Sequence, residues 1–164
     1  MFGRLSRHGR RWLSSASFEP RNPDWEEAVR ATFRAQPFMA LIGARLSHAS
    51  PGAVDIVLRG SDEVNSTLLQ HHGFYHAGVT MTIGDVAAGL AAQTLYPPGT
   101  SVLTTELKVN LLAPARPDAA GEMVARGRVV RPGRTLTVCR SDVCIGSDAI
   151  ATFLMTMFAI PHEP

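Results

Sequence analysis

Cysteine is scarce in this sequence. Only Cys139 and Cys144 occur among 164 residues, and two sulfurs five positions apart do not supply the four paired ligands of a structural zinc site. Both cysteines fall in one predicted strand, where an odd separation places their side chains on opposite faces. We therefore expect neither a zinc site nor a disulfide between them.

Charge is also sparse, and lysine is almost absent. Charged residues make up 18% of the chain, the formal net charge is +2, and Lys108 is the only lysine. A nucleic-acid surface needs a concentrated basic patch, so the composition argues against a nucleic-acid partner. No apolar run reaches the roughly 18–20 residues of a membrane-spanning helix. The 45% of hydrophobic residues suffices for the core of one domain.

Acidic residues are missing from the first part of the chain. The segment before Glu19 contains four arginines and no acid. Arginine and serine mixed with scattered apolar residues are typical of a mitochondrial transit peptide, which would place the protein in the mitochondrial matrix. A disordered basic tail on a cytoplasmic protein has the same composition. We expect residues 1–18 to be targeting or tail sequence and residues 19–164 to form one domain.

The pattern of apolar residues predicts an α+β fold. A helix is expected from Asn22 to Gln36. Strands are expected at 38–47, 53–59, 102–112, 122–131, 135–145 and 149–160, with turn signals between most of them. Residues 78–95 are small, apolar and free of proline before Pro97, which predicts one buried helix. Strands joined by short turns are mostly antiparallel, so we expect a curved antiparallel sheet around this central helix.

One carboxylate, Asp85, lies in the middle of the expected central helix. Its sequence neighbours are small and apolar, and an unpaired buried charge is costly, so a functional role would explain it. The residues that share its helix face are mostly small: Gly78, Met81, Thr82, Gly89 and Ala92. Such a face lets a ligand or another backbone approach. The alternative is an aspartate on an exposed stripe, or one that caps a neighbouring segment.

The expected start of this helix could stabilise an oxyanion. His76, Ala77 and Gly78 lie where free backbone N–H groups meet the positive end of the helix dipole. An ordinary glycine-containing helix start would look the same. We expect His76 to orient the loop. His76 and the nearby His71 and His72 have no acidic or cysteine partner close by in the sequence, so no metal is expected.

Two polar residues outside the helix could hold a carbonyl oxygen or a water molecule. Gln70 precedes the histidine loop, and its amide can both donate and accept. Thr104 belongs to the strand expected at 102–112, where alternation places it on one face with Glu106 and Lys108. Each could equally be an ordinary surface or strand residue.

These segments together resemble the PaaI-like (phenylacetate-pathway type) hotdog thioesterases. The usual signature of that family is an Asn or Gln, then His-Gly-Gly, then a helix that carries Asp, and it matches Gln70–Gly78 followed by Asp85. The stretches 104–115 and 127–135 also resemble the family. The resemblance implies a hotdog fold, an acyl-CoA substrate and no cofactor. It also implies homodimers or dimers of dimers, in which one protomer supplies the loop and its neighbour the carboxylate.

The resemblance further implies a role for each matching residue. Asp85 matches the catalytic carboxylate, a general base for water or a nucleophile. Gln70 matches an Asn that helps to hold the thioester or the water, and Thr104 matches a Ser or Thr that assists the carboxylate. His76–Gly78 match the loop whose amide after the histidine polarises the thioester carbonyl. Ala77 departs from the middle glycine: it keeps the N–H but restricts the backbone.

Acyl-CoA thioesterase is therefore the function that the sequence favours. Coenzyme A would lie near the surface, where arginines such as Arg128, Arg131 or Arg134 could bind its phosphates. A hotdog hydratase or dehydratase and a non-catalytic acyl-CoA-binding hotdog protein are the alternatives, since a fold alone does not fix function.

Overall fold

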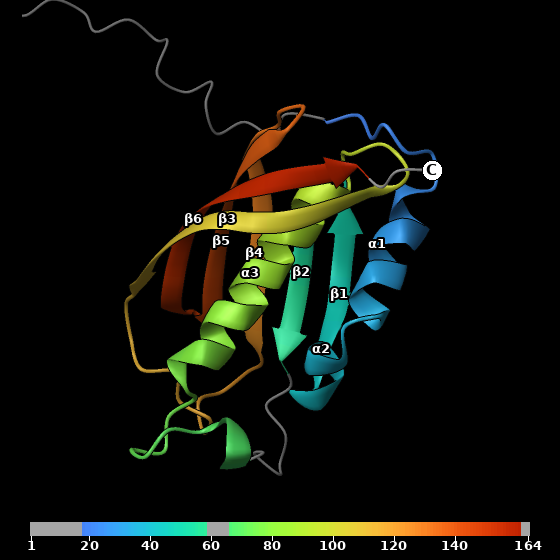
Figure 1. Ribbon diagram of the computed structural model, residues 1–164. Helices are drawn as coiled ribbons and strands as arrows, with labels where there is room; N and C mark the ends of the chain where they lie inside the picture. The colour runs from blue at the N-terminus through green and yellow to red at the C-terminus, as the bar shows by residue number, and fades with distance from the viewer. Residues whose placement is uncertain (1–17, 59–65, 162–164) are drawn as a thin grey trace, which may run out of the picture.

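The structure is a computed structural model, and it describes residues 18–58 and 66–161. The predicted targeting segment lies outside the described residues except for Phe18. The elements follow one another as α1 (Trp25–Arg34), α2 (Pro37–Leu41), β1 (Ala44–Ser50), β2 (Ala53–Leu58), the 3-10 turn η2 (Ser66–Leu68), α3 (Ala77–Gln93), β3 (Thr100–Leu111), β4 (Met123–Arg131), β5 (Leu136–Ile145) and β6 (Asp148–Pro161) (Figure 1). No helix in the described part is long and apolar enough to cross a membrane.

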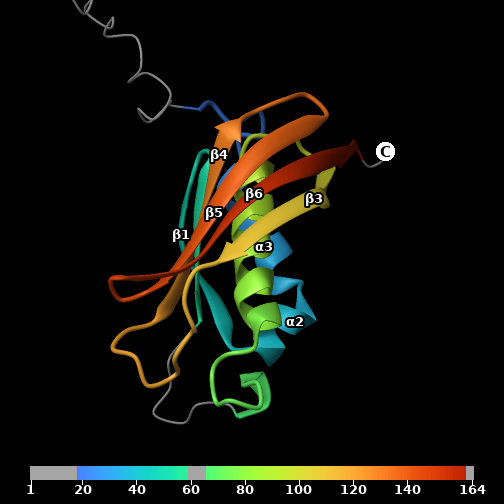
Figure 2. The ribbon, with the colours of Figure 1, turned by 90° about the vertical axis from the view of Figure 1, so that its left-hand side faces the viewer.

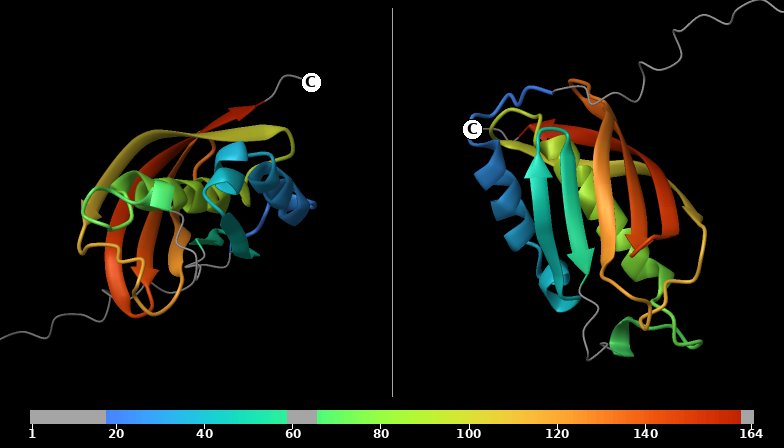
Figure 3. Two further views of the ribbon diagram at one scale, coloured as in Figure 1. Left: turned by 90° about the horizontal axis from the view of Figure 1, so that it is seen from below. Right: turned by 180° about the vertical axis from the view of Figure 1, so that it is seen from behind.

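The six strands form one antiparallel sheet in the order β1-β2-β4-β5-β6-β3. The sheet curls around α3, as the views in Figures 1 and 3 show. Figure 2 shows α3 between the strands on one side and the blue helices α1 and α2 on the other. The predicted α+β architecture is confirmed, and the helix expected at 78–95 is α3. Because β1 and β3 stand at the ends of the order, they are the two edges of the sheet.

Helix α3 packs closely on β4 because a glycine faces it. A Cβ added to Gly127 would collide with the carbonyl oxygen of Ala87 in α3. A Cβ at Gly84, one turn earlier in α3, would lie 2.9 Å from the ring of Phe153 in β6. These contacts bury α3 on the faces that carry alanine, isoleucine and leucine, which explains why its sequence lacks an ordinary polar face.

The strand predicted at 38–47 is wrong over its first half. Pro37–Leu41 is the short helix α2, with proline at its first position, where its missing N–H costs nothing. Gly43 follows with φ +71°, a left-handed conformation that favours glycine, and β1 begins only at Ala44. A short apolar run fits one helical turn as well as a strand, so periodicity did not separate the two.

The predicted alternation along 102–112 holds from Glu106 to Leu111 but is wrong for Thr104, because β3 contains a β-bulge between Thr104 and Glu106. Thr104 pairs with Met157, and the next pair is Glu106 with Thr156, so Thr105 is the extra residue. Directly opposite residues share a face of the sheet. Thr104 therefore points to the side of buried Met157, whereas Glu106 accepts a hydrogen bond from the hydroxyl of Thr156 on the other side. The bulge turns Thr104 toward α3.

The two cysteines are free thiols, as predicted. Cys139 is buried in the core and Cys144 is half-buried. Burial raises the pKa of Cys139 to about 12, so its thiol stays protonated and unreactive at neutral pH.

Replacing Gly127 by alanine should lower the free energy of unfolding by about 3 kcal/mol, because the backbone must shift to admit the methyl group. Gly89→Ala is the matched control. It lies in α3, and a Cβ there meets nothing within 4 Å, so alanine should stabilise the helix by about 1 kcal/mol. Urea denaturation of both variants tests the close packing of α3 on β4. Wild-type stability of Gly127→Ala would contradict it.

Candidate active site

Asp85 is held by a hydroxyl group that the bulge in β3 brings to it. The Thr104 Oγ1 donates a hydrogen bond of 2.6 Å to Asp85 Oδ1, and it also lies 3.4 Å from the sulfur of Met157. A hydrogen bond of this length to a carboxylate is typical of charge assistance. The helix and the edge strand thus meet at the one acidic residue of α3.

Two opposing effects act on the Asp85 carboxyl. Burial raises its pKa, and the hydrogen bond from Thr104 lowers it, with burial the larger effect. The pKa therefore lies above the usual aspartate range. A carboxylate whose pKa is raised toward neutrality is a stronger general base while it remains ionised at physiological pH.

A cavity of about 280 Å³ opens beside Asp85. Helix α1 and its end, α3 and the first part of β3 form its wall: Thr32, Gln36, Asp85, Val86, Gly89, Leu90, Gln93, Ser101, Val102, Leu103 and Thr104. Asp85 is the only ionisable residue in this lining. We call this space the Asp85 cavity.

Sequence reasoning did not single out the far side of the Asp85 cavity. Helical spacing had placed Gly89 on the face of Asp85, but it was not extended to Gln93, which lies two turns after Asp85. Thr32 lies far away in the sequence. It enters the site only because α1 packs near α3, where Gln93 Nε2 donates to Thr32 Oγ1 at 2.8 Å.

Gln70 shapes the turn that precedes α3. Its backbone N–H donates to the carbonyl of Phe74 at 2.8 Å, and the N–H of Gly73 donates to the carbonyl of Gln70 at 2.9 Å. The side-chain oxygen of Gln70 accepts from the N–H of His72 at 2.9 Å. This oxygen is therefore used within the turn, and the side-chain NH₂ group is the part of the amide that could meet a substrate.

His76 caps the N-terminus of α3. Its Nδ1 accepts from the N–H of Gly78 at 2.9 Å, and its backbone N–H donates to the carbonyl of Leu68 at 2.8 Å. An accepting Nδ1 carries no proton, so the neutral ring is protonated at Nε2. The amide of Gly78 is thus occupied, whereas that of Ala77 has no acceptor among the described residues.

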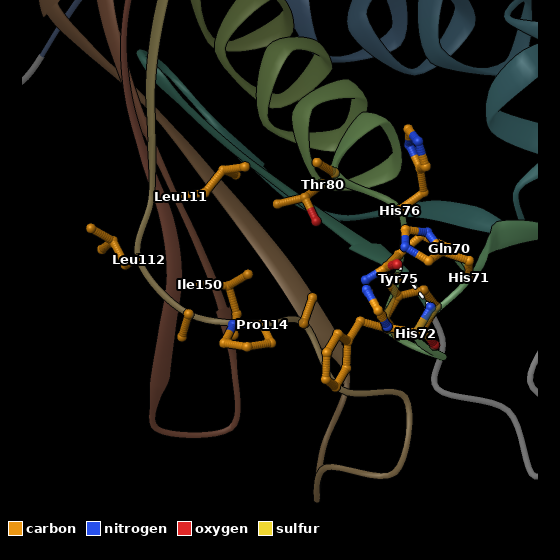
Figure 4. A pocket seen from close by; sticks show the side chains of 14 residues that line it. Gln70, His71, His72, Tyr75, His76, Thr80, Leu111, Leu112, Pro114 and Ile150 are labelled. Atoms are coloured by element: carbon orange, nitrogen blue, oxygen red, sulfur yellow. Dashed lines mark hydrogen bonds between the residues drawn. The ribbon is translucent and has the colours of Figure 1, made fainter.

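A larger cavity of about 760 Å³ lies at this loop (Figure 4). The loop and the first turn of α3 line one side, and the end of β3 with the segment after it lines the other: Gln70, His71, His72, Phe74, Tyr75, His76, Ala77, Thr80, Leu111, Leu112, Ala113, Pro114, Ala115 and Ile150. In Figure 4, the Leu111 side chain points across this space toward the first turn of α3, where Thr80 lies. We call it the loop cavity.

Within one chain, the loop and the carboxylate lie apart. Asp85 follows Ala77 by eight positions in α3, which corresponds to about 12 Å along a helix axis. The Asp85 cavity and the loop cavity share no lining residue. The structure therefore brings Asp85 and Thr104 together, groups Gln70 with His76–Gly78, and separates the two groups.

The arginines expected to meet phosphates differ in their surroundings. Arg128 is paired with Asp55, with Nη1 and Oδ1 2.6 Å apart. Arg131 and Arg134 are exposed, and no ion pair involves them within the described residues. Arg116 was not among the arginines expected from the sequence. Its Cζ lies 5.1 Å from the ring centroid of Phe74, a residue that lines the loop cavity.

Known proteins share both the sequence pattern and the fold. The sequence model of the thioesterase superfamily matches residues 72–152, which include His76, Asp85 and Thr104. A Halobacterium salinarum protein that is named as a proposed esterase is 30% identical over 115 residues. The match covers 67% of this chain and 71% of the relative. The chain belongs to the thioesterase superfamily.

Two solved structures share the fold of this chain. A thioesterase family protein from Silicibacter pomeroyi is 38% identical, with a TM-score of 0.76 over 84% of this chain and 99% of its own. The Escherichia coli PaaI protein has a TM-score of 0.74 over 85% and 96% of the two chains. Its identity of 16% supports the fold alone. The predicted PaaI-like hotdog fold is confirmed.

Replacing Thr104 by valine should move the acidic limb of the pH profile of kcat/KM upward. The variant keeps the β-branched shape but removes the hydrogen bond that lowers the pKa of Asp85. A base with a higher pKa loses its proton only at higher pH, so we expect the acidic limb to lie at higher pH than in wild type. Thr105→Val is the matched control. It makes the same substitution at the next residue, whose hydroxyl donates to the carbonyl of Thr156 and not to Asp85. Identical limbs in Thr104→Val and wild type would contradict this role of Thr104.

Proposed function

We propose that this member of the thioesterase superfamily is an acyl-CoA thioesterase, which hydrolyses a fatty or aryl acyl-CoA to the free acid and coenzyme A. The observation that carries the proposal is the half-buried Asp85 carboxylate, with its raised pKa and its hydrogen bond from Thr104. Membership of the superfamily supports hydrolysis of a thioester. The Asp85 cavity offers the reacting groups a place beside this carboxylate.

In the proposed mechanism, Asp85 acts as general base. It takes a proton from a water molecule as the water oxygen attacks the thioester carbonyl carbon. The N–H of Ala77 and the positive end of the α3 dipole stabilise the oxyanion. The carbon–sulfur bond then breaks, and the departing thiolate takes the proton from Asp85. Direct attack by Asp85, which would form an acyl anhydride, is the alternative route.

Each complete site is proposed to combine two copies of the chain. One carbonyl cannot lie beside both Ala77 and Asp85 of the same α3, because these residues are about 12 Å apart along its axis. Exposed leucines on the inner face of the edge strand β3 favour contact with a second copy of the chain. Leu107 and Leu111 are 37% and 53% exposed there, although they pair with buried residues of β6. A homodimer or a pair of dimers would cover them.

Asp85→Asn should lower thiol release from acyl-CoA by about 10²–10⁴-fold, because an amide cannot take a proton from water. The same variant should be more stable than wild type above the usual aspartate pKa. The folded pKa of Asp85 is raised, so the charged form costs stability as the pH rises through it. Thiol release from short, medium, long and aryl acyl-CoAs, together with thermal unfolding at neutral pH, measures both effects.

Three outcomes would speak against the proposal. Turnover of Asp85→Asn equal to wild type would exclude Asp85 as the base. Binding of acyl-CoA by the folded wild-type oligomer without thiol release would indicate a non-catalytic binding protein. A modified acyl group that stays attached to coenzyme A would indicate a hydratase or dehydratase.

Ala77→Pro should remove the proposed oxyanion donor without disturbing the helix. Ala77 is the first residue of α3, where proline is well tolerated, and His76 has φ −60° and ψ 137°, the extended conformation favoured before proline. The loss of one oxyanion donor should lower kcat by about 10²–10³-fold. Ala77→Gly keeps the N–H and is the control.

Mixing the Ala77→Pro and Asp85→Asn chains by joint refolding tests the shared site. In a mixed dimer, one site collects both substitutions and the other has neither, so about a quarter of the sites should regain full activity after random pairing. If each site lies within one chain, the mixture stays as inactive as the two variants alone.

A further inference from the structure

Gly89 is unlike every other glycine in the described part of the chain. Six glycines have a positive φ: Gly43, Gly52, Gly73, Gly99, Gly121 and Gly146. Four more would place a Cβ less than 3 Å from a neighbouring atom: Gly78, Gly84, Gly127 and Gly133. A Cβ at Gly89 would meet nothing within 4 Å, and its φ is not in the left-handed region. Nothing in the fold of one chain requires glycine there.

This glycine has a cost, because it lies inside the 17-residue helix α3. Glycine in a helix interior is about 1 kcal/mol less favourable than alanine. Gly89 follows Asp85 by one helical turn and lines the same cavity. The missing side chain therefore keeps free the space directly beside the carboxylate, where a group from outside the chain can lie.

The lining of the Asp85 cavity identifies that group by its chemistry. A thioester has two arms, the acyl group and coenzyme A with its phosphates. Phosphates bind to cationic side chains, and the only ionisable residue in this lining is the acidic Asp85. Val86, Leu90 and Val102 provide apolar contacts instead. The cavity therefore fits the acyl arm.

A hydrogen-bonded pair, Gln93 and Thr32, lines the cavity at the end away from Asp85. Gln93 lies two helical turns after Asp85, and its Nε2 donates to Thr32 Oγ1 at 2.8 Å, which joins α3 to α1. Gln36 Nε2 donates to the carbonyl of Thr32 at 3.3 Å. Gly89 lies one helical turn after Asp85 and one turn before Gln93, so it lies between the carboxylate and this pair.

We propose that Gly89 and Gln93 determine which acyl groups the enzyme accepts, with the acyl arm lying over Gly89 and ending at the Gln93–Thr32 pair. The cavity volume is about 280 Å³. A water molecule occupies about 30 Å³ and a methylene group is of similar size, so the cavity holds on the order of nine such groups. The substrate class is therefore a compact acyl group: a short or medium chain, or one aromatic ring. This inference rests on the proposed thioesterase function.

The test uses the full-length protein and measures kcat/KM across straight-chain acyl-CoAs from acetyl to palmitoyl, and for phenylacetyl-CoA. Wild type should prefer short or medium chains and discriminate against palmitoyl. Gly89→Leu fills the space beside Asp85, so the octanoyl-to-acetyl ratio of kcat/KM should fall about tenfold or more. Gln93→Ala removes the end of the cavity, so the optimum should move in the opposite direction, to longer chains.

Gly89→Ala keeps the proposal testable if leucine prevents folding. Alanine fits the fold, so this variant should melt at a higher temperature than wild type and still show a lower octanoyl-to-acetyl ratio, chiefly through KM. Unchanged chain-length profiles in Gly89→Ala and Gln93→Ala, both active, would overturn the inference and leave the thioesterase proposal intact. Loss of the oligomer in Gly89→Ala would assign the space to a second copy and also overturn it. No thiol release by wild type would reject the proposed function itself, and this inference with it.

Discussion

The hydrogen bond from Thr104 to Asp85 depends on nearly every large feature of the fold. It requires α3 to lie inside the curved sheet and β3 to stand at the sheet edge beside it. It also requires a bulge that turns one hydroxyl inward. Burial in an apolar helix alone would push the carboxyl toward its neutral form. The hydroxyl opposes that effect, and the result is an ionisable base with a raised pKa. Such a group costs stability, as functional residues often do.

The same enclosure of α3 explains why one chain carries two separate half-sites. The helix presents its N-terminal amides at one end and Asp85 near its middle, about 12 Å apart along its axis. The exposed Leu107 and Leu111 have a related cause, since α3 does not reach across the inner face of the edge strand. A second copy laid against β3 would cover the leucines and deliver a second loop to Asp85. Under the proposed mechanism, assembly and catalysis then both require the same contact, a second copy of the chain against β3.

The sequence predicted those parts of the structure that depend on local signals. The uniformly apolar α3, most strands, and the position of Asp85 and His76 on the helix followed from periodicity and from helix-start residues. The prediction of the first strand was wrong over its first half because Pro37–Leu41 is too short for periodicity to distinguish a helical turn from a strand. The predicted orientation of Thr104 was wrong because a single extra residue, Thr105, reverses the alternation. Nothing in the sequence pattern indicates this bulge. The contact of Thr32 with Gln93 depends on how two distant helices pack, which no local rule contains.

Two glycines show how α3 has been fitted to its two environments. At Gly127, the missing side chain is needed because the helix backbone fills the space, so the chain itself explains the residue. At Gly89, no atom of the chain fills the space, and the helix would be more stable with alanine. One face of α3 is therefore specified by packing, whereas the other leaves space that a bound group can enter. Asp85 lies on the second face, so the group that enters passes the only carboxylate of the helix. A structural role alone would favour alanine at position 89 and a neutral residue at position 85, whereas the proposed hydrolysis of a bound acyl thioester accounts for both.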